Sequence, residues 1–209
     1  MFLTKYLLLI INCYLIGSIP TAYIVLKRMH NKNITEEGTG NVGAMNIYDV
    51  SGSKITGIIV FIIDFLKGLI PVFILAYVIR LPIEFIVIPA AALVAGHNFS
   101  VWLKFKGGRG LATAAGVMII INFWLFIIWC GIFLLTFFIK KNVHISNVLA
   151  TVFLPLLIIF SGGFLIRYNY GIGNENLEIL FTLTSLISLL ILIKHIEPVI
   201  NFFKEYKKK

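Results

Sequence analysis

Long, uninterrupted apolar runs recur from one end of the 209-residue chain to the other. Each run is close to or above the roughly 20 residues that a helix needs to cross the hydrocarbon core of a bilayer. The runs are continuous rather than alternating, which favours spanning helices over barrel strands. With 59% hydrophobic residues and a mean hydropathy of +0.98, the chain is too apolar for a soluble domain of this length. The sequence therefore predicts an all-α, polytopic integral membrane bundle that forms one domain over residues 1–209.

The number of crossings depends on the fourth apolar stretch, which is the longest. If it crosses once, the basic segments before and after it fall on opposite sides of the membrane. If it turns at Asn122 and crosses twice, Lys27, Lys104, Lys140 and the lysine-rich tail all lie on the cytoplasmic side, as the positive-inside rule requires. Two crossings give about seven transmembrane helices, although each half is then short for a bilayer; one long tilted helix is the alternative. The apolar stretches cover approximately residues 3–26, 54–79, 85–103, 111–139, 148–166 and 177–193, with a turn rich in Gly and Asn before the last.

The net charge of +9 comes mainly from basic residues in the short segments between apolar runs and in the tail. This distribution indicates membrane orientation and contact with anionic lipid rather than a nucleic-acid partner, which would need one basic water-facing surface. Lys27 and Arg28 follow the first apolar run, so we expect a retained first helix with its N-terminus outside. Cys13 and Cys130 lie inside apolar runs and make neither a disulfide framework nor a metal set, and no metal or cofactor is expected.

Asp64, Lys67 and His97 fall well inside predicted spans, where charges are costly and face the bundle or a polar cavity. Asp64 and Lys67 share one helix face at spacing i, i+3. They are either a structural pair that locks the bundle or part of the wall of a substrate cavity. His97 either bonds a neighbouring carbonyl or belongs to a site at the basic loop that follows it. Pro71, one turn after Lys67, is a candidate kink.

Two glycine-rich segments offer backbone N–H groups to an anion. Gly38-Thr-Gly-Asn-Val-Gly43 matches the dinucleotide-binding fingerprint in letters, but no βαβ unit surrounds it, so that interpretation is rejected. Its glycines still permit positive φ and close approach to an anion, and Thr39, Asn41 and Asn46 add neutral hydrogen-bonding groups.

The second segment places cations and glycines just before a helix predicted to begin near Leu111, which favours phosphate binding at the helix N-terminus. The alternative is a cytoplasmic loop that only obeys the positive-inside rule. No Walker A pattern is present, so ATP is not indicated. The residues are Lys104, Lys106, Gly107, Gly108, Arg109 and Gly110.

Four segments together resemble the bacterial acyl-phosphate:glycerol-3-phosphate acyltransferase family: Gly17-Ser-Ile-Pro20, Gly38–Asn46, Asp64-Phe-Leu-Lys-Gly68 and Gly96–Thr113. The resemblance implies a seven-helix enzyme of the bacterial cytoplasmic (inner) membrane with its site on the cytoplasmic side. It implies transfer of a fatty acyl group from acyl phosphate to glycerol 3-phosphate, giving lysophosphatidic acid and phosphate in the first acylation step of phospholipid synthesis. Acyl-CoA and acyl carrier protein would not be used.

The chain departs from the family pattern at five positions. Thr39 in place of serine keeps the hydroxyl, and Arg109 in place of lysine keeps the charge. Asp49 reverses the charge of an arginine, Pro198 replaces the asparagine of a His-x-Glu-Asn pattern, and Asn201 replaces a later arginine. The last three changes leave open a divergent paralogue, either a carrier for a phosphorylated solute or a non-catalytic lipid-binding partner.

The resemblance and the residue chemistry together assign the site. The attacking hydroxyl's proton passes to His97, to His195 or to the leaving phosphate, and the sequence leaves all three open. The candidate catalytic residues are His97, His195 and Thr39. The candidate substrate-binding residues are Asn41, Asn46, Lys104, Lys106, Gly107, Gly108, Arg109, Gly110 and Glu197. The expected partners are acyl phosphate, glycerol 3-phosphate and membrane lipid, with no nucleic acid.

Overall fold

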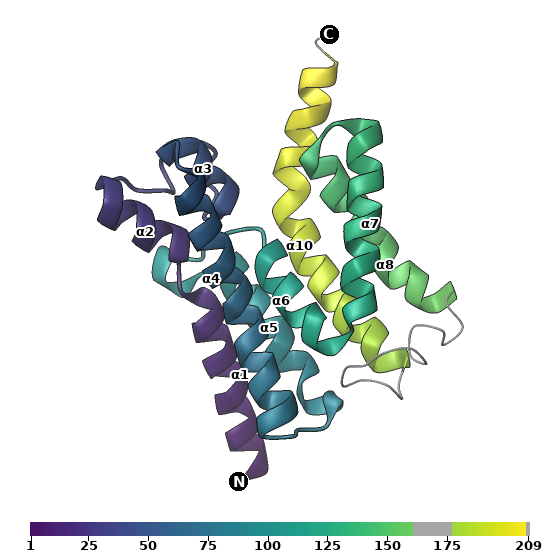
Figure 1. The fold of residues 1–209 in the computed structure, drawn as a ribbon. Helices are drawn as coiled ribbons and strands as arrows, with labels where there is room; N and C mark the ends of the chain where they lie inside the picture. The colour runs from purple at the N-terminus through teal and green to yellow at the C-terminus, as the bar shows by residue number, and fades with distance from the viewer. Residues whose placement is uncertain (161–176, 208–209) are drawn as a thin grey trace. The chain divides into compact units, whose positions relative to one another are not determined.

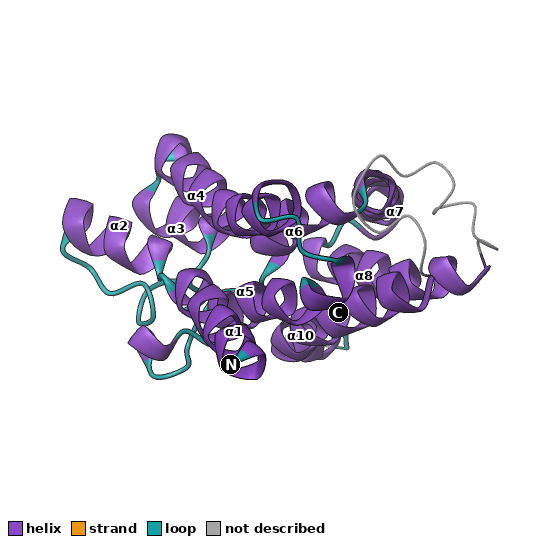
Figure 2. Cartoon of the chain, turned by 90° about the horizontal axis from the view of Figure 1, so that it is seen from below, coloured by secondary structure: helices purple, strands orange, loops and turns teal. Residues whose placement is uncertain are grey.

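A computed structural model describes residues 1–160 and 177–207 of the chain (Figure 1). The described residues form helices joined by short loops, and neither described range contains a strand (Figure 2). The all-α prediction is therefore confirmed. The chain divides into two compact units, Met1–Val117 and Met118–Lys209, and each is described by itself below. The predicted turn rich in Gly and Asn lies outside the described residues.

Six helical stretches in the described ranges are long and apolar enough to cross a membrane, and a shorter apolar helix accompanies them. This confirms a multi-pass membrane protein. The six are Phe2–His30, Lys54–Val78, Ile83–Leu103, Phe123–Lys140, Val143–Phe160 and Leu177–Lys204, and the shorter helix is Leu111–Ile121.

The long fourth apolar stretch is divided at Asn122, as predicted. Helix α6 (Leu111–Ile121) ends and α7 (Phe123–Lys140) begins there, because Asn122 is extended (φ −156°, ψ 101°) and its Oδ1 accepts the Leu125 N–H at 3.0 Å. This is an N-cap bond, which favours starting a new helix over continuing the old one. At 1.5 Å per residue, the 11 residues of α6 reach about 16 Å, roughly half the thickness of a bilayer core.

The first span differs from the single helix expected, because it breaks into α1 (Phe2–Ser18) and α2 (Thr21–His30). Pro20 has no N–H and disfavours helical geometry at Ile19. The carbonyls freed at the break are taken up by side chains from elsewhere in the first unit: Ser100 Oγ donates to Ser18 O at 2.6 Å, and Lys67 Nζ donates to Ile19 O at 3.1 Å. Such replacement donors allow a helix to break inside a membrane.

The other elements of the first unit are several short helices and one long helix, α4 (Lys54–Phe73). Helix α4 runs beside α1 in the opposite direction and leads back from the end of the unit that carries α2 and α3 (Figure 1). It continues through Pro71 and is followed directly by a π-helical turn, η1. The elements are α3 (Ala44–Ser51), α4 (Lys54–Phe73), η1 (Ile74–Val78), η2 (Ile83–Phe85), α5 (Val87–Asn98) and η3 (Val101–Leu103).

Glycines set the close approach of helices in this unit. A Cβ on Gly96 would overlap the Tyr14 carbonyl oxygen, which brings α5 onto α1. A Cβ on Gly68 would overlap the carbonyl oxygen of Thr113, which brings α4 onto the start of α6. Small residues at such crossings let helix backbones touch where lipid offers no hydrophobic driving force. The C-terminal end of α5 is thereby fixed against α1, and the N-terminal end of α6 is fixed against α4.

The second unit contains α7, α8 (Val143–Phe160) and α10 (Leu177–Tyr206). Lys141 adopts a left-handed conformation after α7, and Asn142 Oδ1 then caps α8 by accepting the N–H groups of His144 and Ile145. Thr151 of α8 joins the three helices, because its hydroxyl accepts from Trp129 Nε1 at 3.1 Å and its carbonyl accepts from Ser188 Oγ at 3.1 Å.

Candidate active site

The basic loop turns sharply after α5. The Ser100 carbonyl accepts the N–H groups of Leu103 and Phe105, and Lys104 and Phe105 both take left-handed φ values, 53° and 62°. The Lys104 and Lys106 side chains are exposed, and that of Arg109 is half-buried. Helix α6 begins directly after the loop, with its first bond from Ala114 N–H to Gly110 O. The predicted helix start near Leu111 is therefore confirmed, and its opening N–H groups, which have no partner within the helix, directly follow the basic loop in sequence.

Gly108 is the point where three separate segments of the first unit meet. Its N–H donates to the His97 carbonyl at 3.0 Å. A Cβ on Gly108 would overlap Nε2 of the His97 ring and would lie 2.7 Å from the carbonyl oxygen of Val42. The basic loop, the histidine and the first glycine-rich segment are therefore in contact, although Val42 and Gly108 lie far apart in sequence.

The neighbouring glycines are required for two different reasons. Gly110 has φ +82°, which favours glycine. A Cβ on Gly107 would lie 2.6 Å from the Asn98 carbonyl oxygen, so Gly107 is needed for close packing. The sequence pointed to a flexible backbone for anion binding, and the structure adds that this backbone lies packed on the end of α5.

The first glycine-rich loop is held by the Asn46 side chain, which is 2% exposed. Its Oδ1 accepts the Thr39 N–H at 2.8 Å, and its Nδ2 donates to the carbonyls of Glu37 and Asn41 at 3.1 and 3.0 Å. Both polar atoms of the amide therefore hold the loop in shape. Thr39 itself is exposed and Asn41 is partly exposed, so these two polar side chains of the loop are accessible from outside the protein.

Asp64, Lys67 and His97 form a buried cluster beside this meeting point, each less than 10% exposed. Asp64 Oδ1 lies 2.8 Å from Lys67 Nζ and 3.7 Å from His97 Nδ1. Lys67 also donates to Ile19 O, and Thr113 Oγ1 donates to the Asp64 carbonyl at 2.9 Å. The predicted pairing of Asp64 with Lys67 is confirmed; it ties α4 to the break after α1 and places a carboxylate next to His97.

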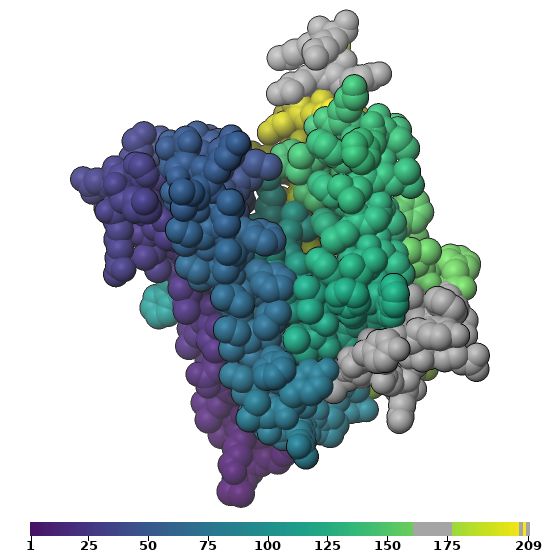
Figure 3. Space-filling model, in the orientation of Figure 1, coloured from purple at the N-terminus to yellow at the C-terminus, as the bar shows by residue number. Residues whose placement is uncertain are grey.

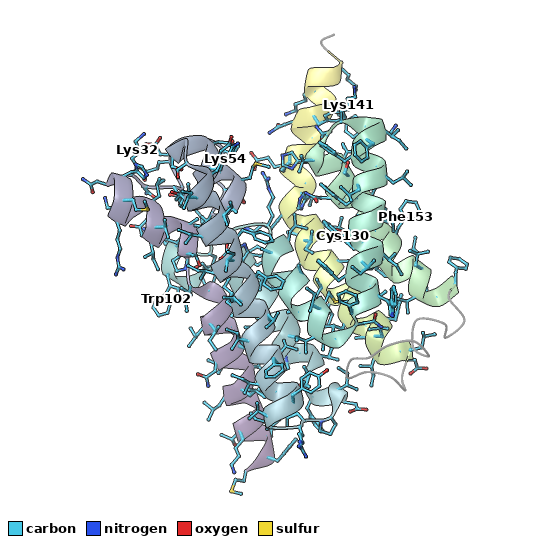
Figure 4. The ribbon with its side chains drawn as sticks, viewed as in Figure 1. Lys32, Lys54, Trp102, Cys130, Lys141 and Phe153 are labelled. Atoms are coloured by element: carbon cyan, nitrogen blue, oxygen red, sulfur yellow. The ribbon has the colours of Figure 1, made fainter. Side chains whose placement is uncertain are left out.

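An apolar groove of about 480 Å³ lies between α1 and α4, helices whose surfaces run side by side in Figure 3. Ile63, Ile70 and Ile74 line it, together with the Lys67 side chain. Because the Lys67 ammonium bonds Ile19 O and Asp64, we infer that the aliphatic stem borders the groove while the charge points into the unit. Figure 4 shows Lys32 and Lys54 at one end of this unit and Trp102, which is 61% exposed, pointing away from it.

His195 and Glu197 lie on α10, in the second unit. His195 is fully buried, its Nδ1 lies 2.9 Å from the Ile191 carbonyl, and its ring meets the His144 ring edge-on with centroids 6.0 Å apart. Glu197 is exposed, and α10 continues through Pro198. Sequence reasoning missed His144, because a single histidine after a lysine pair has no distinctive spacing. It also missed Val42 and Asn98, whose contacts with the loop glycines involve main-chain oxygens and one amide.

Comparison with known proteins identifies this arrangement. A sequence model described as "Glycerol-3-phosphate acyltransferase" matches residues 7–205. The chain belongs to the glycerol-3-phosphate acyltransferase family. The match spans both compact units, and it confirms the family that the four sequence segments resemble. The chain is therefore an acyltransferase.

Relatives and solved structures agree with this membership. A glycerol-3-phosphate acyltransferase from Endomicrobium trichonymphae is 37% identical over 97% of this chain and 98% of its own length. Another from Geotalea daltonii is 34% identical over 94% of this chain and 93% of its own. The crystal structure of PlsY (YgiH), an integral membrane glycerol 3-phosphate acyltransferase, is similar in its glycerol 3-phosphate form, with a TM-score of 0.80 and 29% identity over 96% of this chain and 93% of that one. Its lysophosphatidic acid form gives a TM-score of 0.78 over the same shares.

Proposed function

We propose that this enzyme transfers a fatty acyl group from an acyl phosphate to glycerol 3-phosphate, giving lysophosphatidic acid and inorganic phosphate. The observation that carries the proposal is the meeting of the basic loop, His97 and the first glycine-rich loop at Gly108. Family membership supplies the acyltransferase class. The acyl phosphate donor and the residue roles below are part of the proposal.

The chemistry asks mainly for positioning and charge stabilisation. An acyl phosphate is an activated mixed anhydride, so the enzyme must hold two anionic substrates together and stabilise the developing charge on the carbonyl oxygen. Two phosphates repel each other, and Lys104, Lys106 and Arg109 offset that repulsion. The N-terminus of α6 adds N–H groups and a partial positive charge that suit a phosphate oxygen.

The acceptor is assigned to the first glycine-rich loop. Thr39 and Asn41 are the side chains that this loop presents, so we assign them to the second phosphate or the glycerol hydroxyls. Asn46 acts by holding the loop. His97, whose ring lies against Gly108, receives the attacking hydroxyl's proton in this proposal. His195 and Glu197 stay predicted participants from the second unit.

The assay that tests the function uses the detergent-purified full chain with palmitoyl phosphate and labelled glycerol 3-phosphate. We expect labelled lysophosphatidic acid and release of phosphate. Palmitoyl-CoA and palmitoyl acyl carrier protein serve as control donors and should give no product. Solute flux in proteoliposomes without any product would instead identify a carrier. If neither product nor solute flux is observed, the remaining interpretation is a non-catalytic lipid-binding protein.

We also propose that the basic loop faces the cytoplasm across a bacterial cytoplasmic membrane. The basis is the excess of lysine and arginine in the loop and in the segment after α1. In a chain whose two cysteines are replaced by serine, a cysteine introduced by Lys106→Cys should react in intact cells with a membrane-permeant maleimide only. Reaction with an impermeant maleimide at the outer surface would contradict the proposed side and, with it, access to soluble glycerol 3-phosphate.

A further inference from the structure

The proposed function gives no role to segment 17–20, which breaks the first span into α1 and α2. A continuous helix would offer the carbonyls of this segment to N–H groups one turn further on. The break instead lets the Ser18 carbonyl accept the Ser100 hydroxyl at 2.6 Å. Ser100 is 1% exposed and lies between α5 and the basic loop. The break in the first span therefore provides an acceptor for the residue that precedes the loop.

A second hydrogen bond joins α1 to the same junction. The Tyr14 hydroxyl donates to the Phe99 carbonyl at 2.6 Å, and Phe99 is the C-cap residue of α5. Tyr14 and Ser18 are four residues apart, so they lie on one face of α1. That face donates one hydrogen bond and accepts the other, and its two partners are consecutive residues. Two bonds to neighbouring residues fix the direction of a chain segment as well as its position.

Glycines bring α1 and α5 close enough for both bonds to form. A Cβ on Gly17 would overlap the Leu93 carbonyl oxygen. A Cβ on Gly96 would overlap the Tyr14 carbonyl oxygen and would lie 2.8 Å from the Ser18 nitrogen. Small residues allow such backbone contact between membrane helices. The crossing fixes the end of α5 against α1, and the two hydrogen bonds then set the direction in which the chain leaves α5.

The junction held in this way is the start of the basic loop. The Ser100 carbonyl accepts the N–H groups of Leu103 and Phe105, and these two bonds form the turn of the loop. Leu103 packs against the core cluster that includes Leu26 of α2. Ser100 thus holds α1 through its hydroxyl and the loop turn through its carbonyl. A shift of Ser100 relative to α1 would move the turn and the cations that follow it.

We propose that the break at segment 17–20, together with Tyr14, positions the basic loop for phosphate binding. Tyr14 and Ser100 are positioning residues in this proposal, because they act through the loop. The proposal rests on the phosphate-binding role proposed for that loop. A break that only redirected the chain could have its carbonyls satisfied by any donor. Here one of the donors is the residue on which the loop turns.

The test removes the two hydrogen bonds without adding an atom to the packed junction. The double variant Tyr14→Phe/Ser100→Ala should lower kcat/KM for acyl transfer at least about tenfold, mainly through a higher KM for a phosphorylated substrate. This is part of the roughly 100-fold loss that a misplacement of about 1 Å can cause. Each single variant should lose about threefold or less, because the remaining bond still holds the junction.

Tyr23→Phe is the matched control, since Tyr23 is a partly buried tyrosine of α2 that packs against the core cluster. It should leave both KM values close to those of the wild-type chain. Thermal melting should show that the double variant is still folded at the assay temperature.

Hydrogen–deuterium exchange reports the position of the loop without turnover. In the double variant, amides within residues 101–108 should exchange at least about threefold faster, because the bonds of the turn depend on a fixed Ser100. Amides in the middle of α4 should keep their wild-type rates. If the double variant does not stay folded, faster exchange confined to residues 101–108 in either single variant supports the proposal, and unchanged exchange there overturns it.

The kinetic and exchange results separate positioning from simple support of the fold. A double variant with kcat/KM within twofold of Tyr23→Phe would overturn the proposal. Lower thermal stability with unchanged exchange in residues 101–108 would also overturn it, since the two bonds would then only stabilise the fold. An absence of lysophosphatidic acid from the wild-type chain would instead contradict the proposed function, and the exchange rates would still show whether Tyr14 and Ser100 hold the loop.

Discussion

Gly108→Ala is expected to lower the kcat/KM for acyl transfer about 100-fold, the scale of loss that a misplacement of about 1 Å can cause. The added methyl group would overlap the His97 ring and approach the Val42 carbonyl to 2.7 Å. Neither neighbour is the free end of a flexible side chain, so the loop itself has to move. The measurement is steady-state turnover of the purified variant with both substrates varied.

Stability is the control for this prediction, because over-packing costs about 1–3 kcal/mol by itself. The variant's thermal melting should show that it is still folded at the assay temperature. Gly131→Ala on α7 is the matched substitution, since a Cβ there meets nothing within 4 Å. Gly108→Ala with turnover within twofold of Gly131→Ala would show that the close packing at Gly108 does not shape the site.

Arg109→Ala should lower acyl transfer at least about tenfold, because a hydrogen bond to a charged group contributes about 1.5–3 kcal/mol. The loss should appear mainly as a higher KM for a phosphorylated substrate. Arg109→Lys, which restores the lysine usual in the family, should keep most of the activity. Turnover and KM are measured in detergent with membrane insertion checked by fractionation.

Arg28→Ala provides the matched control, since Arg28 is an exposed cation on α2 outside the assigned site. It should leave both KM values close to those of the wild-type chain. Near-normal turnover of purified Arg109→Ala would refute the phosphate-binding role and leave the positive-inside rule as the explanation for this loop's charge.

Hydropathy and a few local signals were enough to predict much of the fold. The apolar runs predict membrane helices because a bilayer accepts only backbone that satisfies its own hydrogen bonds. The break at Asn122 was also predictable, since charge placement favoured two crossings over one long tilted helix and asparagine is a strong N-cap residue. The break at Pro20 was missed, because an uninterrupted apolar run predicts one continuous helix. A break inside it is favourable only where other side chains donate to the backbone carbonyls that the break leaves without helical hydrogen bonds. Those donors, Ser100 and Lys67, are distant in sequence.

The candidate site was found in parts. The glycines and cations of the basic loop indicated phosphate binding by their chemistry alone. The pairing of Asp64 with Lys67 followed from helical spacing. The sequence did not show that the Asn46 side-chain amide hydrogen-bonds the loop backbone. It also did not show that His97 lies between Asp64 and Gly108.

The sequence by itself determined that this chain is a helical membrane protein with two glycine-rich segments, one of them basic, and its motifs indicated the acyltransferase family. Local composition carries these properties, because bilayer insertion and anion binding depend on residue type and near spacing. Only the tertiary structure decided which segments touch. Val42, His97 and Gly108 come into contact because glycines allow neighbouring backbones to approach closely. Such a contact arises from three-dimensional packing, which cannot be read from the spacing of residues along the chain.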